Sequence, residues 1–221
     1  MIPYLVPFVL YLGLTQLLVG ANPEYYAWLY PALVVVVGGV TFALLYGRGI
    51  LRPHFRVLPG VVVGLVGIAL WIAICQLEWE KQIGALLPSW LQPGARPAFN
   101  PNTAIDNTAA RWGFVVMRLT GLALLVPIAE ELFWRGFLAR WLISPDWRSQ
   151  SLGRFTPFSF VVVTLMFTLA HPEWMAAAVY CVLLNLLLSW TRDLWNCVVA
   201  HGVSNLVLGV YVLWTDSWEL W

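Results

Sequence analysis

Long apolar runs separated by short polar segments dominate the amino-acid sequence. Crossing the hydrocarbon layer of a membrane, about 30 Å thick, takes about 20 helical residues, and their backbone groups must be hydrogen-bonded within the segment. Runs such as the four valines at 34–37 lack the alternation of a membrane β-strand. We therefore predict an all-α fold, a polytopic transmembrane helical bundle of about seven spans, or eight if the fourth is broken. The expected spans are 2–20, 26–46, 57–77, 112–143, 157–172, 174–190 and 194–214.

Glycine and proline residues inside these runs indicate where helices meet or bend. The pair Gly38 and Gly39, together with Gly64 and Gly67, would let neighbouring helices approach closely, because small residues are typical of such interfaces. Pro127 lacks a backbone N–H and therefore marks a kink or a break in the fourth span.

The composition supports this interpretation. Of 221 residues, 61% are hydrophobic and 10% are charged, and the mean hydropathy is +0.77. Soluble domains average about 45–50% apolar and about 25% charged residues, so the composition argues against an ordinary water-soluble protein. The net charge of +1 provides no basic surface for nucleic acid. We expect one integral-membrane domain over residues 1–221, with membrane lipid and a peptide or protein as partners and no prediction of oligomeric state.

Arginine residues follow every second expected span. Short cytoplasmic loops accumulate positive residues, so these connections are expected on the cytoplasmic side. The N-terminus would then be cytoplasmic and the segment 84–110 would form the one sizeable external loop. The first residues lack the positive leader of a cleavable signal, so the first span is expected to be a retained anchor. The arginines concerned are Arg48, Arg52, Arg56, Arg140, Arg148, Arg154 and Arg192.

A few ionisable residues lie inside the apolar runs. Placing a charge at the middle of a bilayer costs at least about 2.5–3.5 kcal/mol, so such residues are functional candidates. Arg118 is expected to snorkel toward the external face or to pair locally, without a catalytic role. The other candidates are Glu130, Glu131 and Arg135 in the fourth run, His171 with Phe167 one turn before it, and His201 with Asn205 in the last run.

Helical spacing orients these side chains relative to one another. Glu131 and Arg135 are four residues apart and can form an ion pair, whereas Glu130 points about 100° away from Glu131. His201 and Asn205 are also four residues apart, so both project in one direction. A carboxylate can act as a general base on water, and an imidazole or amide can bind the water or the oxyanion. Such groups are sufficient for peptide-bond hydrolysis.

Three motifs occur in order on separate apolar runs: Glu-Glu-x-x-x-Arg at 130–135, Phe-x-x-x-His at 167–171 and His-x-x-x-Asn at 201–205. Together they resemble the type II CAAX prenyl proteases and bacteriocin-processing membrane proteases of the CPBP or Abi family. The resemblance covers residues 110–210. It implies an intramembrane endopeptidase with a cavity open to the cytoplasmic side, and the short chain is similar to members in the cytoplasmic membrane of prokaryotes. It does not imply that the substrate is prenylated.

The resemblance also implies a role for each motif residue. Glu130 would activate the water, His171 would help bind it, and His201 with Asn205 would form the oxyanion site. Supporting positions would be Glu131, Arg135 and Phe167. No metal is expected.

The positions of the motif residues along their spans do not agree in depth. At about 1.5 Å per residue, Glu130 would lie about 15 Å from Arg140, whereas His171 would lie about 21 Å from Pro157. Straight, upright helices would therefore place His171 too close to the outer face. A tilted fourth span, or a break near Pro127, would bring the two side chains to one level.

Other interpretations use the same residues differently. Glu131 and Arg135 could form only a structural ion pair. Two histidines and a carboxylate could hold Zn²⁺, although the sequence contains no His-Glu-x-x-His motif. A non-catalytic scaffold or immunity factor would retain the residues for packing. A proton relay or transporter would also use buried Glu and His, but the sequence contains no duplicated halves.

Overall fold

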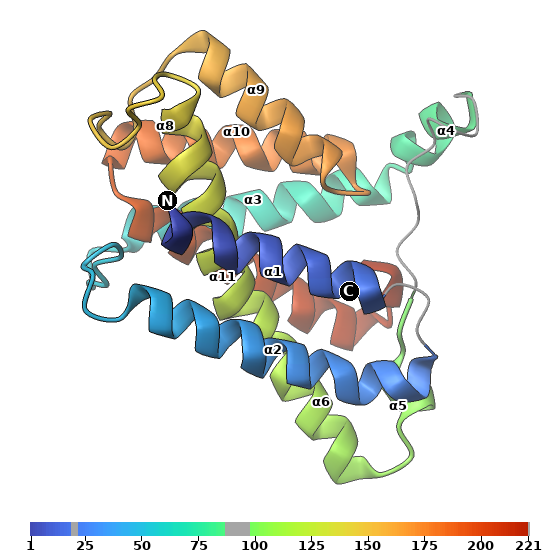
Figure 1. Ribbon diagram of the computed structural model, residues 1–221. Coiled ribbons are helices and arrows are strands. Elements are labelled where there is room, and N and C mark those ends of the chain that lie inside the picture. The colour runs from blue at the N-terminus through green and yellow to red at the C-terminus, as the bar shows by residue number, and fades with distance from the viewer. Residues whose placement is uncertain (19–21, 87–97, 221) are drawn as a thin grey trace.

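The computed structural model describes residues 1–18, 22–86 and 98–220, and within these ranges the ordered elements are helices, with no strand. Figure 1 shows the helices gathered in one bundle. The elements outside the fourth expected span are α1 (Ile2–Leu18), α2 (Pro23–Leu45), α3 (Leu58–Gln76), α4 (Trp79–Leu86), α5 (Pro101–Ala104), α9 (Pro157–Leu169), α10 (Trp174–Thr191), α11 (Leu194–Thr215) and the 3₁₀ turn η4 (Trp218–Leu220).

Five helices of the described ranges are long and apolar enough to cross a membrane. They are Tyr25–Leu45, Leu58–Gln76, Thr108–Trp141, Trp174–Thr191 and Leu194–Thr215. Two shorter apolar helices, Ile2–Leu18 and Pro157–Leu169, account for the remaining expected spans. The prediction of an all-α, polytopic helical bundle is therefore confirmed. Residues 87–97 of the predicted external loop 84–110 lie outside the described ranges.

The fourth expected span is one continuous helix, Thr108–Trp141, called here the central helix. It consists of α6 (Thr108–Thr120), the π-helical turns η2 (Gly121–Leu125), α7 (Val126–Glu131), the π-helical turns η3 (Leu132–Leu138) and α8 (Ala139–Trp141). The break considered at Pro127 does not occur; instead the turn just before it is widened, since the N–H of Val126 bonds to the carbonyl of Gly121 five residues earlier. Figure 1 shows the central helix running steeply across the other long helices.

Close contacts of α3 with α10 and α11 depend on glycine. A Cβ atom added to Gly64 would lie 2.5 Å from the carbonyl oxygen of Ala200 on α11, and one added to Gly67 would overlap the ring of Tyr180 on α10. The predicted close approach is thus confirmed at Gly64 and Gly67. It is wrong at Gly38 and Gly39, where an added Cβ would meet nothing within 4 Å.

Replacing Gly64 by Ala is expected to lower the free energy of unfolding by about 1–3 kcal/mol, because the methyl group must push two helix backbones apart. For a chain of this size, each kcal/mol corresponds to roughly 2–4 °C in Tm. Thermal unfolding in detergent measures the effect, with Gly39→Ala as the matched control that should not lower Tm. Equal Tm values for the two variants would contradict the proposed contact between α3 and α11.

Candidate active site

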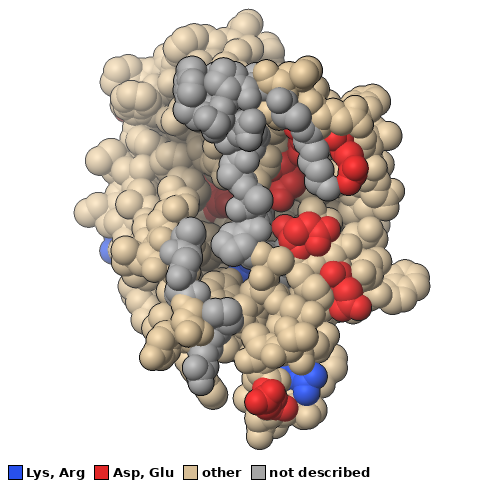
Figure 2. Space-filling model, turned by 90° about the vertical axis from the view of Figure 1, so that its right-hand side faces the viewer, with Lys and Arg blue, Asp and Glu red and all other residues tan. Residues whose placement is uncertain are grey.

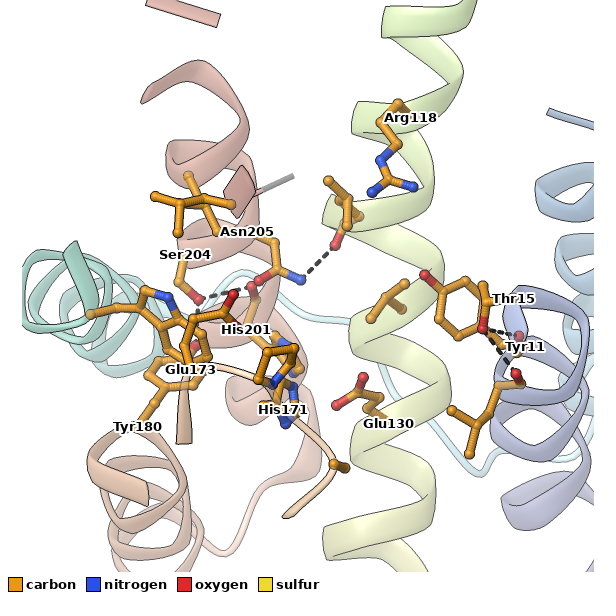
Figure 3. A pocket seen from close by; sticks show the side chains of 18 of the residues that line it. Tyr11, Thr15, Arg118, Glu130, His171, Glu173, Tyr180, His201, Ser204 and Asn205 are labelled. Carbon is orange, nitrogen blue, oxygen red and sulfur yellow. Dashed lines mark hydrogen bonds between the residues drawn. The ribbon is translucent and has the colours of Figure 1, made fainter. Parts of the chain in front are cut away.

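A pocket of about 450 Å³ lies between the central helix and the surrounding helices. This volume falls within the range of about 300–1,000 Å³ that is typical of ligand sites. The pocket brings together side chains from three separate motifs, and Figure 3 shows the polar ones converging on it. The predicted site residues that line it are Glu130, Phe167, His171, His201 and Asn205.

Glu130 of α7 is 8% exposed and faces this pocket. Its Oε2 atom has no hydrogen-bond partner among the described residues. An isolated buried carboxylate oxygen is unfavourable unless a polar group or water satisfies it. In Figure 3 the carboxylate points toward the side of the pocket that carries His171 and His201. The arrangement leaves one carboxylate oxygen available to a molecule in the pocket.

Glu131 faces away from the pocket and forms the buried ion pair expected from its spacing. Both Glu131 and Arg135 are 0% exposed, and the Nη1 of Arg135 donates to the Oε1 of Glu131 at 3.1 Å. Arg135 also donates from Nε to the Oδ1 of Asn185 at 3.2 Å. The guanidinium lies 5.0 Å from the ring centroid of Phe167, which places it over a π-face. The pair is thus fixed to both α9 and α10.

His201 joins this network from α11. Its Nδ1 lies 2.9 Å from the Oε1 of Glu131. A carboxylate only accepts hydrogen bonds, so Nδ1 is assigned as the donor, and Nε2 is the second ring nitrogen available for chemistry. Sequence spacing predicted the Glu131–Arg135 pair but not the contact with a histidine 70 residues further along the chain. Glu131 therefore orients His201 in addition to pairing with Arg135.

His171 lies just beyond the end of α9, in the turn that leads to α10. Its Nδ1 donates to the carbonyl oxygen of Phe167 at 2.8 Å, and its ring stacks on the ring of Phe167 with centroids 4.4 Å apart. A carbonyl cannot donate, so Nδ1 of His171 carries a proton, and in the neutral imidazole Nε2 then carries the lone pair. The oblique course of the central helix allows Glu130 and His171 to line one pocket despite their unequal positions along their helices. Within the bundle the central helix is thus oblique to the other long helices, as one of the two expected solutions to the depth mismatch requires.

Asn205 satisfies a carbonyl that the central helix leaves without a helical donor. The N–H of Val126 donates to the carbonyl of Gly121, and the next residue, Pro127, has no N–H to donate. The carbonyl of Leu122 therefore needs a hydrogen-bond donor from outside the helix backbone. The Nδ2 of Asn205 donates to this carbonyl at 2.9 Å. Asn205 thus joins α11 to the central helix while it lines the pocket, and its second amide hydrogen remains as a further donor.

Several pocket residues carried no motif in the sequence. Arg118 is 8% exposed, and its Nη1 donates to the hydroxyl of Tyr26 at 2.7 Å. Of the two alternatives expected for Arg118, pairing with a neighbouring side chain is therefore the one observed. Tyr180 and Ser204 form a hydrogen bond in the pocket wall. The only sequence signal for Ser204 was its position one turn after His201, on the same helix face.

Metal ligation was the alternative use of these residues. Within the described ranges, no group of three or more His, Cys, Asp or Glu side chains is close enough together to hold a metal ion. A catalytic zinc site needs three protein ligands and one open position, so the side chains as placed do not fit one.

Glu80 of α4 lies outside the spanning helices, near the residues that follow His171. Its Oε1 accepts hydrogen bonds from the backbone N–H groups of Met175, at 2.5 Å, and Ala176, at 3.4 Å, at the start of α10. Burial raises the pKa of the Glu80 carboxyl, while these two hydrogen bonds partly offset the increase. The carboxylate therefore fastens α4 to the first turn of α10, beside the pocket residue Glu173.

Comparison with known proteins gives one match. Residues 111–207 match the family described as "Type II CAAX prenyl endopeptidase Rce1-like". The matched segment contains all three motifs and all the candidate site residues predicted from the sequence. No curated protein and no solved structure matched the chain.

Proposed function

Because the chain belongs, through residues 111–207, to the Rce1-like family of type II CAAX prenyl endopeptidases, we propose that it is an intramembrane endopeptidase that uses Glu130 to activate water. The observation that carries the proposal is the Oε2 atom of Glu130, buried without a protein partner among the described residues, in a pocket shared with His171 and His201. A general base must have such an accessible acceptor within a protected site.

In the proposed reaction, the Glu130 carboxylate takes a proton from a water molecule while the water oxygen attacks the carbonyl carbon of the peptide bond. The Nε2 lone pair of His171 helps hold the water. Nε2 of His201, in the form with both ring nitrogens protonated, and the second amide hydrogen of Asn205 donate to the oxyanion. Glu130 then returns the proton to the leaving amine as the carbon–nitrogen bond breaks. Neither a metal ion nor a covalent intermediate is part of this scheme.

The remaining predicted side chains support this site in the proposal. Glu131 holds His201 in the required orientation, and Arg135 balances the charge of Glu131. Phe167 provides the surface against which the His171 ring stacks. Each of these contacts restricts the rotamers of a residue that would act on the substrate, which is how supporting residues improve a site.

The membrane is proposed to be the cytoplasmic membrane of a prokaryote, with the N-terminus in the cytoplasm. The support for this orientation is the arginine content of the connections after α2, the central helix and α10, which the positive-inside rule assigns to the cytoplasm, whereas the prokaryotic membrane rests on the family resemblance alone.

The experiment that tests the peptidase proposal compares peptides released in a strain lacking the protein after complementation with wild type or Glu130→Gln. Peptides that depend on wild type and disappear with Glu130→Gln would identify both the activity and its substrate. A non-catalytic scaffold or immunity factor predicts identical peptide profiles for the two complemented strains. The comparison therefore separates the enzyme from a packing role of the same residues.

Removing divalent metal is expected to change the rate of peptide cleavage by less than about twofold, because the scheme relies only on acid–base and hydrogen-bonding groups. The measurement is cleavage by purified protein before and after treatment with 1,10-phenanthroline, with a zinc peptidase as the positive control. Loss of cleavage that is restored by adding zinc would establish the metal-dependent alternative instead.

A further inference from the structure

The pocket lies toward one end of the helical bundle. Its lining includes Leu18 at the end of α1, Tyr26 near the start of α2, Trp71 in the last turns of α3 and Pro172 between α9 and α10. These positions adjoin the connections α1–α2, α3–α6 and α9–α10. Lining residues at the same end, such as Ala98, are exposed. The mouth of the pocket is therefore at the end formed by these connections.

The two ends of the bundle carry opposite charges. At the end opposite the pocket mouth, the connections α2–α3, α8–α9 and α10–α11 and the last turn of the central helix contain Arg48, Arg52, Arg56, Arg140, Arg148, Arg154 and Arg192, against Asp146 and Asp193. The segments of the sequence between and after the spans on the other side contain Glu24, Glu78, Glu80, Asp106, Glu173, Asp216 and Glu219, against Lys81, Arg96 and Arg111. Figure 2, which looks at the pocket end, shows several acidic side chains and few basic ones.

The positive-inside rule assigns the arginine-rich end to the cytoplasm, because Lys and Arg in short loops determine membrane orientation. The opposite end, with the pocket mouth, is then on the non-cytoplasmic side. The family resemblance implies a cavity open to the cytoplasm, whereas the arginines imply that the pocket mouth is on the other side. These two implications exclude each other in this structure. The cytoplasmic cavity would require every arginine-rich connection to be translocated.

We propose that the pocket opens on the non-cytoplasmic face of the membrane and accepts a peptide segment that is exposed on that face. The statement about the substrate rests on the proposed peptidase function, whereas the statement about orientation does not. The substrate class is therefore an exported or membrane-anchored protein with its cleavage site at the outer surface. Since the pocket end is acidic, we expect neutral or basic segments rather than acidic ones, which like charges would repel.

Cysteine labelling on intact cells tests the orientation. The variants carry Cys75→Ser, because Cys75 is partly exposed, while Cys181 and Cys197 are buried and stay. Ala98→Cys and Ala170→Cys report on exposed positions that line the pocket, and Ser151→Cys is the matched exposed position at the arginine-rich end. With a membrane-impermeant maleimide, the two pocket variants are expected to take up at least about tenfold more label than Ser151→Cys. Permeabilising the cells should remove the difference.

The opposite pattern, with Ser151→Cys labelled and the pocket variants protected until permeabilisation, would overturn the proposed orientation. Equal labelling of all three variants in intact cells would also overturn it. The measurement needs no proteolysis, and adding Glu130→Gln should leave the pattern unchanged. A failure of the peptidase function is therefore distinguishable from a failure of the orientation.

The substrate class is tested separately, by mapping the cleavage sites of the peptides whose release depends on Glu130. Their cleavage sites are expected to map to exported segments of proteins. If Glu130-dependent sites map to cytoplasmic segments, the proposed substrate class is wrong even where the peptidase function holds.

Discussion

Glu130→Gln is expected to reduce the rate of peptide cleavage by about 10²–10⁴-fold, the range over which general acid–base catalysis typically contributes. Glutamine has nearly the same shape as glutamate but cannot accept the proton of the attacking water. The Oε2 atom of Glu130 has no hydrogen-bond partner among the described residues. The substitution therefore breaks no hydrogen bond of that oxygen. The bundle is therefore expected to stay folded, with Tm unchanged or higher, because a buried charge without a bonded partner is lost.

The measurement is cleavage of an identified substrate by purified protein in proteoliposomes, together with thermal unfolding of the same preparation. Asp106→Asn is the control, because Asp106 is an exposed acid that does not line the pocket. It should cleave at the wild-type rate. A folded Glu130→Gln protein that also retains this rate would remove Glu130 from the mechanism and favour a packing role for the motif residues.

The helices could be predicted from the sequence because membrane spans are determined by local composition. An apolar run long enough to cross a membrane must satisfy its own backbone, and no distant residue is needed to specify that. The pair Glu131 and Arg135 was predictable for the same reason, since four-residue spacing fixes the distance between two side chains on one helix.

Contacts between helices could not be predicted in the same way. The hydrogen bond of Asn205 to Leu122 depends on a widened turn before Pro127, and nothing in the sequence specifies that α11 passes this point. Likewise, Gly38 and Gly39 resemble Gly64 as sequence features, but only Gly64 meets a neighbouring backbone. Which helices pack together is a property of the whole bundle, so local patterns indicate candidates for contact without identifying the partner.

The face of the membrane on which the pocket opens can be inferred only from the sequence and the structure together. The arginines determine the expected orientation from the sequence alone. Only the structure shows that His171 and Glu173 line the pocket at the end away from those arginines. A family resemblance transfers residue types along aligned motifs, but it does not transfer the charges of the connecting loops, which set orientation in each chain.

Arg135→Met is expected to destabilise the protein by about 3–5 kcal/mol, the typical cost of removing one partner from a buried ion pair. Met fills a comparable apolar volume, so the main loss is electrostatic: Glu131 stays 0% exposed without its guanidinium, and Asn185 loses a donor. For a chain of this size the change corresponds to a decrease in Tm of roughly 6–20 °C. Arg48→Met, at an exposed arginine, is the control and should remain within about 0.5 kcal/mol of wild type.

The double variant Glu131→Gln with Arg135→Met separates the structural role of the ion pair from its role in positioning His201. With both members of the ion pair replaced, neither is left buried without the other, so more than half of the lost stability should return. Cleavage should stay impaired, because the Nδ1 of His201 no longer donates to a carboxylate that fixes its orientation. Thermal unfolding and cleavage rates on the same preparations measure the two effects. If the double variant regained wild-type cleavage together with its stability, Glu131 would have no positioning role.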